Sequence, residues 1–140
     1  MRKHIVYLFM LLVAGCGGDD SSDNANQPGT LQFDSTSYDV TEGTDGYVNI
    51  IVTRSGGRDG AASVDYTTAD DNAVAGSDYA AMNGTLDWPD GLSGNLTISI
   101  AITDDNTEEP SESFTVALSN ATLAALGKNT SAIVNIIDDD

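Results

Sequence analysis

Residues 95–103 read NLTISIAIT, and their alternation decides the class of fold. Leu96, Ile98, Ile100 and Ile102 are separated by polar or small residues, so every second side chain is apolar. A period of two is typical of a β-strand that buries one face and exposes the other to water. We therefore expect a strand here, packed by one face on a hydrophobic core.

The same alternation returns along the chain between turns rich in Gly, Pro, Asn and Asp. Further strands are expected at residues 31–33, 37–40, 47–54, 63–69, 85–88, 113–119 and 131–137. Short strands with one apolar face each, about seven in all, predict an all-β, antiparallel immunoglobulin-like sandwich of two sheets. Only residues 121–128 could turn helically, and that stretch is too short to be stable alone.

The first 30 residues have a different composition and are expected to lie outside the sandwich. Charged residues at 2–4 precede an apolar run at 5–13, and small residues follow, as in a secretory signal peptide. Residues 13–16 read VAGC, which resembles the lipobox of bacterial lipoproteins, where the cysteine is lipidated and becomes the mature N-terminus.

This resemblance implies a signal peptide at 1–15, an acylated Cys16 with a flexible tether through residue 30, and a folded domain at 31–140. It also implies attachment to a membrane of the bacterial cell envelope through the lipid. Gly17, directly after the cysteine, points to the outer membrane. The alternative is an ordinary secretory signal in which Cys16 is incidental.

The charge balance and the rare residue types exclude several functions. The chain carries 22 Asp and Glu against 5 Lys and Arg, a formal net charge of −17. It cannot neutralise phosphates, which excludes nucleic acid as a partner. Cys16 is the only cysteine, so no disulfide can form within the chain. The one histidine, His4, lies in the expected signal peptide, so Ser-His-Asp and Cys-His chemistry are absent and no enzyme is expected.

The acidic residues gather where two predicted strands end. One group comprises Asp104, Asp105, Glu108, Glu109 and Glu112, and the other comprises Asp138, Asp139 and Asp140. If both strands point to the same end of the sandwich, the groups meet there, and crowded carboxylates repel one another. Ca²⁺ removes that repulsion and prefers oxygen ligands of this kind, whereas Zn²⁺ fits poorly without histidine or a free cysteine. The alternatives are a solvated acidic rim and a pH-sensitive acidic loop without metal.

Several phrases resemble the Calx-beta domain, a sandwich module of sodium/calcium exchangers, integrins and many bacterial surface proteins. They are SYDVTEG, VTRSGG, VDYTTADDNAVAGSDY, GTLDW, ISIAITDD, EEPSESFTVALSNA and AIVNIIDDD, in the family's order over residues 31–140. The resemblance implies a Ca²⁺ site whose ligands are the acids at matching positions: Glu42, Asp78, Asp104, Asp105, Glu109, Glu112, Asp138, Asp139 and Asp140. Glu108 does not match a ligand position.

The chain departs from the family's pattern at two places. Asn106 stands where the family often has a third aspartate, and an amide is a weaker ligand than a carboxylate. Asp71 and Asn72 stand where the family usually has Gly-Thr, and both residue types tolerate the left-handed backbone that such a turn can require.

These features predict a lipid-anchored, Ca²⁺-binding Calx-beta module on a bacterial surface that serves adhesion or protein–protein interaction. Two alternatives stay open: a metal-free structural interaction domain, and a small carbohydrate- or peptide-binding lipoprotein that stacks its ligand on Trp88. Trp88 is otherwise expected to plug the core or its rim. Tyr66 and Tyr79 are expected to pack against the sandwich, and Arg54 to form a structural ion pair.

Overall fold

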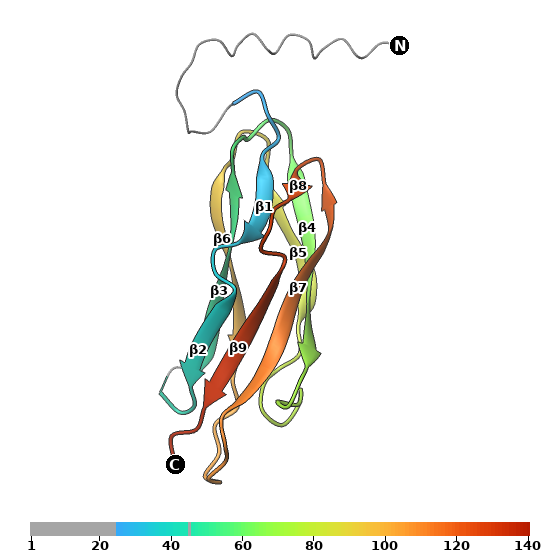
Figure 1. Cartoon of the computed structure of the whole chain (residues 1–140). Coiled ribbons are helices and arrows are strands. Elements are labelled where there is room, and N and C mark those ends of the chain that lie inside the picture. Colours follow the sequence, from blue (N-terminus) through green and yellow to red (C-terminus); the bar gives the residue numbers. More distant parts are fainter. Residues whose placement is uncertain (1–24, 45) are drawn as a thin grey trace.

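Two β-sheets pack face to face in the computed structural model, which describes residues 25–44 and 46–140 (Figure 1). The strands are β1 (Thr30–Phe33), β2 (Ser37–Thr41), β3 (Tyr47–Ser55), β4 (Ala62–Asp70), β5 (Asn83–Trp88), β6 (Gly94–Ala101), β7 (Glu112–Thr122), β8 (Ala125–Leu126) and β9 (Ser131–Ile137). One sheet has the order β6-β3-β1-β8 and the other the order β2-β9-β7-β4-β5. The described residues form no helix, and therefore none that is long and apolar enough to cross a membrane. The predicted all-β class is confirmed.

Three details of the predicted sandwich are wrong. The described residues form nine strands rather than about seven. The pairs β1–β8 and β2–β9 are parallel, so the sheets are not purely antiparallel. Residues 121–128 contain the short strand β8 instead of a helical turn, because Leu123 has a φ of 64°, a left-handed conformation that an α-helix excludes.

The first strand of the sandwich is divided between the two sheets. β1 pairs with β3 in the four-stranded sheet, whereas β2 pairs with β9 in the five-stranded sheet. The backbone N–H of Phe33 donates to the carbonyl of Asn129 (2.8 Å), and that of Ile133 donates to the carbonyl of Thr36 (3.0 Å). These two bonds fix the point where the chain changes sheet.

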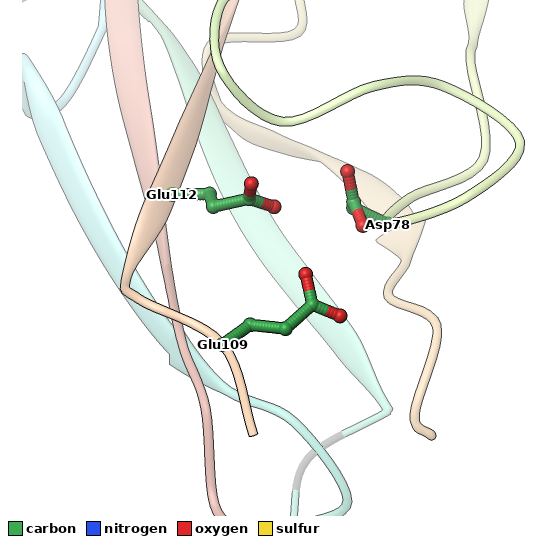
Figure 2. Close-up of side chains that lie close together, drawn as sticks. All are labelled: Asp78, Glu109 and Glu112. Carbon is green, nitrogen blue, oxygen red and sulfur yellow. The ribbon is translucent and has the colours of Figure 1, made fainter. Parts of the chain in front are cut away.

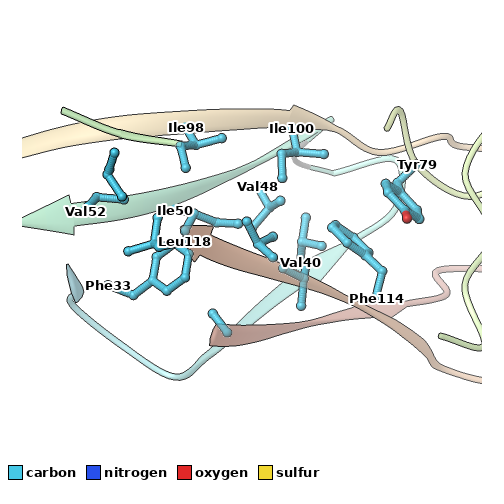
Figure 3. Close-up of a cluster of buried hydrophobic side chains, with 14 of the residues drawn as sticks. Phe33, Val40, Val48, Ile50, Val52, Tyr79, Ile98, Ile100, Phe114 and Leu118 are labelled. Atoms are coloured by element: carbon cyan, nitrogen blue, oxygen red, sulfur yellow. The ribbon is translucent and has the colours of Figure 1, made fainter. Parts of the chain in front are cut away.

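The core lies between the sheets and is built from alternating residues of facing strands (Figure 3). On β3, β6 and β7 the buried apolar side chains are Val48, Ile50, Val52, Ile98, Ile100, Phe114, Val116 and Leu118. Each full burial stabilises the fold by about 1.5–3 kcal/mol. The alternation read from the sequence therefore predicted the inward faces of these strands correctly.

Trp88 belongs to this core. Its side chain is 0% exposed, and the indole Nε1–H donates to the carbonyl of Gly94 at 3.1 Å. The predicted plug is confirmed. The alternative in which a carbohydrate or peptide stacks on Trp88 is wrong, because no face of the ring is open to a ligand.

Residues 27–30 are held against the folded domain, although the tether was expected to continue through residue 30. The carbonyl of Gln27 accepts the N–H of Asp59 (2.8 Å), and the carbonyl of Gly29 accepts the N–H of Ala125 (3.2 Å). Thr30 already pairs with Ser55 in the sheet. These bonds join residues 27–30 to the folded domain. The expected signal peptide and Cys16 lie outside the described residues.

Arg54, at the end of β3, is buried with 1% of its surface exposed. Its guanidinium donates to four backbone carbonyls: Pro28 (2.8 Å), Leu92 (3.0 Å), Asp59 (3.1 Å) and Gly60 (2.9 Å). The predicted ion pair is wrong, since the partners are neutral carbonyls from three separate segments. The side chain acts as a clamp where the chain enters the domain.

The ends of β2, β6 and β9 and the starts of β3 and β7 meet at the opposite end of the sandwich (Figure 1). Glu112 at the start of β7 lies beside Ile136 of β9, and Thr41 at the end of β2 lies beside Ile137. The last residue of β6, Ala101, lies beside Tyr47 at the start of β3. Both acidic segments of the sequence therefore emerge at this one end.

Candidate metal site

The acidic end is assembled from four segments: the turn after β2, the loop between β4 and β5, the loop between β6 and β7, and the residues after β9. The N–H of Glu42 donates to the carbonyl of Ile137 (3.0 Å), which holds the β2 turn beside the end of β9. The N–H of Thr103 donates to the carbonyl of Asp78 (3.0 Å), which holds the β4–β5 loop beside Asp104. Backbone bonds thus bring together acids that are far apart in the sequence.

Asp78 is held by its own turn. Its backbone N–H donates to the carbonyl of Val74 (2.9 Å), and its Oδ2 accepts the N–H of Val74 (2.7 Å). The next residue, Tyr79, is 1% exposed and stacks on Phe114 with ring centroids 3.8 Å apart. The turn therefore rests on the core, and Asp78 Oδ1 is the oxygen left out of the bond to Val74.

Three carboxylates converge at this point (Figure 2). Oxygen atoms of Asp78, Glu109 and Glu112 all lie within 4.8 Å of one another. Two oxygens bound to one Ca²⁺ at the usual 2.3–2.6 Å lie at most about 5 Å apart. The spacing therefore suits a single cation shared by the three side chains.

A second set of carboxylates lies next to this group. A Cβ built on Gly43 would lie 2.6 Å from Asp139 Oδ2 and 2.9 Å from Asp104 Oδ1, which places these two side chains over the glycine. Asp138 Oδ1 is buried and has no hydrogen-bond partner among the described residues. A buried carboxylate oxygen normally has a partner, since leaving it unpaired costs about 1–3 kcal/mol or more.

The pKa values report mutual repulsion at this end. The pKa of Glu42 is raised from 4.5 to about 7, first by burial and then by the charges of Asp138, Asp105, Glu109 and Asp104 in that order. Burial likewise raises the pKa of Glu109, with Asp105 and Asp78 as the next causes. The pKa of Glu112 is raised by burial and then by the charge of Asp78. Acids of both sets raise the pKa of Glu42 and the pKa of Glu109, so the two sets form one electrostatic unit.

No cation of the described residues compensates this charge. Arg54, Arg58 and Lys128 are the Lys and Arg residues in that part of the chain, and all three belong to the other end of the sandwich. The donor set at the acidic end consists of oxygen atoms alone. With its orphaned Asp138 oxygen and its spacing, it fits a hard cation such as Ca²⁺ and not Zn²⁺.

Eight of the nine acids predicted as ligands lie together at this end: Glu42, Asp78, Asp104, Asp105, Glu109, Glu112, Asp138 and Asp139. Asp140 is exposed, and nothing in the described structure ties its side chain to the others. Glu108, which matches no ligand position, is also exposed.

Sequence reasoning missed the residues that support the β4–β5 loop. Asp70 Oδ1 accepts the hydroxyl of Tyr79 (2.5 Å) and the N–H of Ala75 (2.9 Å). Asn72 Oδ1 accepts the N–H of Ser113 (2.7 Å), which ties the loop to the start of β7. Neither Asp71 nor Asn72 has a positive φ, so these residues replace the family's Gly-Thr through side-chain hydrogen bonds and not through left-handed backbone.

The comparisons with known proteins agree with this architecture. A family model described as the Calx-beta domain matches residues 24–140. The sodium/calcium exchanger Calx of Drosophila melanogaster is 34% identical over 124 residues, which are 88% of this chain and 13% of that protein. The extracellular matrix organizing protein FRAS1 of Mus musculus is 34% identical over 139 residues, 94% of this chain and 3% of that protein. The chain thus spans a small part of the curated relatives that it matches.

Solved structures of Calx domains are also similar to this chain. The crystal structure of the apo-form Calx CBD1 domain is 33% identical, with a TM-score of 0.74, over 79% of this chain and 97% of that one. The calcium binding domain CBD12 of CALX1.1 is 33% identical, with a TM-score of 0.73, over 79% of this chain and 44% of that one. On the match over residues 24–140 and these likenesses, the chain belongs to the Calx-beta domain family.

Proposed function

We propose that the chain is a Ca²⁺-binding module whose acidic end is the metal site. The observation that carries this proposal is the convergence of Asp78, Glu109 and Glu112 within 4.8 Å, beside the unpartnered buried oxygen of Asp138 and without a compensating cation among the described residues. Crowding like charges together, some of them half-buried, costs folding free energy, and a divalent cation offsets that cost. The similar domain CBD12 of CALX1.1 is itself described as calcium binding.

The residues divide into two ligand groups in this proposal. Asp78, Glu109 and Glu112 hold one ion, and Glu109 is close enough to the second set to be shared. The second group binds metal on the other side of Glu109. Its members are Asp104, Asp138 and Asp139, together with Glu42 and Asp105. The cation supplies positive charge that lets all these carboxylates stay ionised. The role is binding and not catalysis, and the ordered acidic end serves adhesion or protein–protein interaction.

Calorimetry and thermal unfolding test the metal site on residues 24–140, which hold both sheets and the whole described core. We expect heat on addition of Ca²⁺ and a higher melting temperature, since a ligand at 100 times its Kd stabilises the fold by about 2.7 kcal/mol. Replacing Asp104 and Asp105 together by Asn removes both responses. Glu108→Gln removes one nearby acidic charge at an exposed position outside the site and leaves both responses intact.

A metal-free interaction domain makes the opposite prediction for the same measurements. EDTA then changes neither the melting temperature nor partner binding, and Ca²⁺ gives no heat. That outcome, with a normally folded domain, would overturn the Ca²⁺ proposal.

The attachment of the module is a separate proposal. We infer from VAGC at 13–16 that Cys16 carries a lipid and holds the module at a bacterial cell envelope, at the outer membrane. Cys16→Ser then releases the protein from the membrane fraction and abolishes incorporation of labelled fatty acid. Continued membrane association of the variant would count against the anchor.

A further inference from the structure

The two sheets differ sharply in charge. β1, β3, β6 and β8, which make up the four-stranded sheet, contain no Asp or Glu at all. In the five-stranded sheet, β2, β4, β5 and β7 each contain at least one. In a chain with 22 acidic residues, the four-stranded sheet is therefore the surface that can approach a like-charged neighbour at the lowest electrostatic cost.

Among the described strands, β6 is the one open edge that is both long and uncharged. β8 has two residues, β2 carries Asp39 and β5 carries Asp87. β6 has eight residues without charge or proline, and it pairs with β3 in an unbroken register. Natural proteins usually protect such an edge with charges, proline or bulges, because its free backbone groups are a template for another strand.

The hydrogen-bond pattern shows which backbone groups of β6 are free. The N–H of Ile102 donates to the carbonyl of Gly46 (3.0 Å), so this register position is a hydrogen-bonded pair. Such pairs alternate along an antiparallel ladder, which turns the backbone groups of Asn95, Thr97 and Ser99 away from β3. In agreement, the carbonyl of Ala101 accepts the N–H of Ala80 on that outer side (3.0 Å). From Asn95 to Ser99 no strand of the described structure covers this edge.

We propose that this edge pairs antiparallel with β6 of a second copy of the chain, centred on Thr97. Thr97 then faces Thr97 of the second copy, and Asn95 faces Ser99 of the second copy. Each of these pairs joins outward N–H and C=O groups on both strands, so the edge is self-complementary under a two-fold axis. The four-stranded sheet continues across the axis into that of the second copy.

The charges favour this orientation. Antiparallel pairing places the acidic end of each copy, which follows Ala101, alongside the Gly94 end of the other copy. The Gly94 end holds Arg54 and Arg58 together with Asp59 and Asp90, so it lacks the large excess of negative charge found at the acidic end. The two acidic ends are therefore as far apart as the contact allows. Nothing in this pairing depends on metal, so its failure would not touch the Ca²⁺ proposal.

Sedimentation velocity on residues 24–140 tests the proposal over protein concentrations up to about 1 mM, because an edge contact buries little area and association is expected to be weak. We expect a reversible monomer–dimer equilibrium that strengthens with added salt, which screens the net negative charge. Thr97→Lys places two like charges opposite each other at the axis and raises Kd by about fivefold or more. Thr67→Lys is the matched control, an exposed threonine on β4, which is an inner strand of the five-stranded sheet, and leaves Kd unchanged.

A second variant separates lost pairing from lost folding. Thr97→Pro removes the outward N–H, which the fold does not use, and proline is tolerated on the open side of an edge strand. This variant stays folded and no longer dimerises. A wild-type domain that remains monomeric at 1 mM and high salt, or a dimer that survives both Thr97 variants, overturns the proposal.

Discussion

At the scale of single residues, Gly43 shows how closely the acidic end is packed. It has a φ of 67°, a conformation that favours glycine, and an added Cβ would meet the carboxylates of Asp139 and Asp104 within 3 Å. The backbone turn after β2 and the two side chains thus need the same space. A glycine here lets the carboxylates lie over the main chain.

The contrast between Gly43→Ala and Gly46→Ala isolates that effect. Both glycines have positive φ, so each alanine costs about 1 kcal/mol of stability, but a Cβ at Gly46 has no neighbour within 4 Å. We expect Gly43→Ala alone to weaken Ca²⁺ binding, because it displaces Asp104 and Asp139. Titration calorimetry on both variants measures this, and equal affinities would show that the two carboxylates are not ligands.

The acids could be found from the sequence, whereas their supports could not. Asp104, Asp105 and Asp138 follow strands with strict alternation of apolar residues. That alternation predicts where each strand ends, and therefore that these acids lie at the end of a sheet. Asp70 likewise lies at a strand end, as the last residue of β4, but it accepts the hydroxyl of Tyr79 instead of facing the cluster. Which of two similar acids turns toward the site depends on the path of the β4–β5 loop, and no periodicity encodes that path.

At the scale of elements, Arg54 joins three chain segments outside the strands that the hydrogen bonds of the sheet alone do not hold together. Its guanidinium binds the carbonyls of the entering chain at Pro28, of Asp59 and Gly60 after β3, and of Leu92 before β6. Each bond from a charged donor contributes about 1.5–3 kcal/mol. The end of β3 thus organises the loops around it.

Arg54→Met tests this clamp. It keeps an unbranched apolar stem but leaves four carbonyls without their donor, so we expect a loss of about 3 kcal/mol or more in the free energy of unfolding. Arg58→Met, at an exposed position, should change stability by less than about 0.5 kcal/mol. Urea unfolding followed by tryptophan fluorescence compares the two. Equal midpoints would contradict the clamp.

The elements best predicted from the sequence are those whose own pattern decides their burial. β3, β6, β7 and β9 carry alternating apolar residues and were found within a few residues of their bounds. The pieces β1, β2 and β8 are short, and their sheet membership is decided by partners distant in the chain, such as β9 for β2. The division of the first strand and the absence of a helix at 121–128 therefore could not be read locally.

At the scale of the whole molecule, charge is distributed along the long axis. The carboxylates of the candidate metal site gather at one end of the sandwich, whereas Arg54, Arg58 and Lys128 lie toward the other end, together with Asp59 and Asp90. In the absence of metal, the carboxylates at the acidic end repel one another, and protonation of some of them reduces this repulsion. This arrangement makes stability depend on pH in a direction opposite to that of a salt-bridged protein.

We expect the metal-free domain in EDTA to melt at a higher temperature at pH 5 than at pH 7.5. The pKa of Glu42 is raised from 4.5 to about 7 in the folded state, so between these values the folded state binds more protons than the unfolded state. Stability therefore falls as pH rises through this window. Saturating Ca²⁺ should oppose the trend, because protons compete with the metal.

Glu42→Gln should flatten the pH dependence in EDTA, while Glu108→Gln should leave it unchanged. A melting temperature that rises from pH 5 to pH 7.5 in EDTA would contradict the stored repulsion. Calorimetric scans at closely spaced pH values measure both variants under one set of conditions.

The Arg54 clamp has a mechanical consequence. A pull on the chain at residues 25 and 26 reaches the bond between Pro28 and Arg54 before it reaches the sheet. The guanidinium also binds the carbonyls of Gly60 and Leu92, so these two segments hold Arg54 in place while the bond to Pro28 is loaded. The acidic loops lie at the far end and remain outside this path, so tension on the N-terminal side would leave the carboxylates undisturbed.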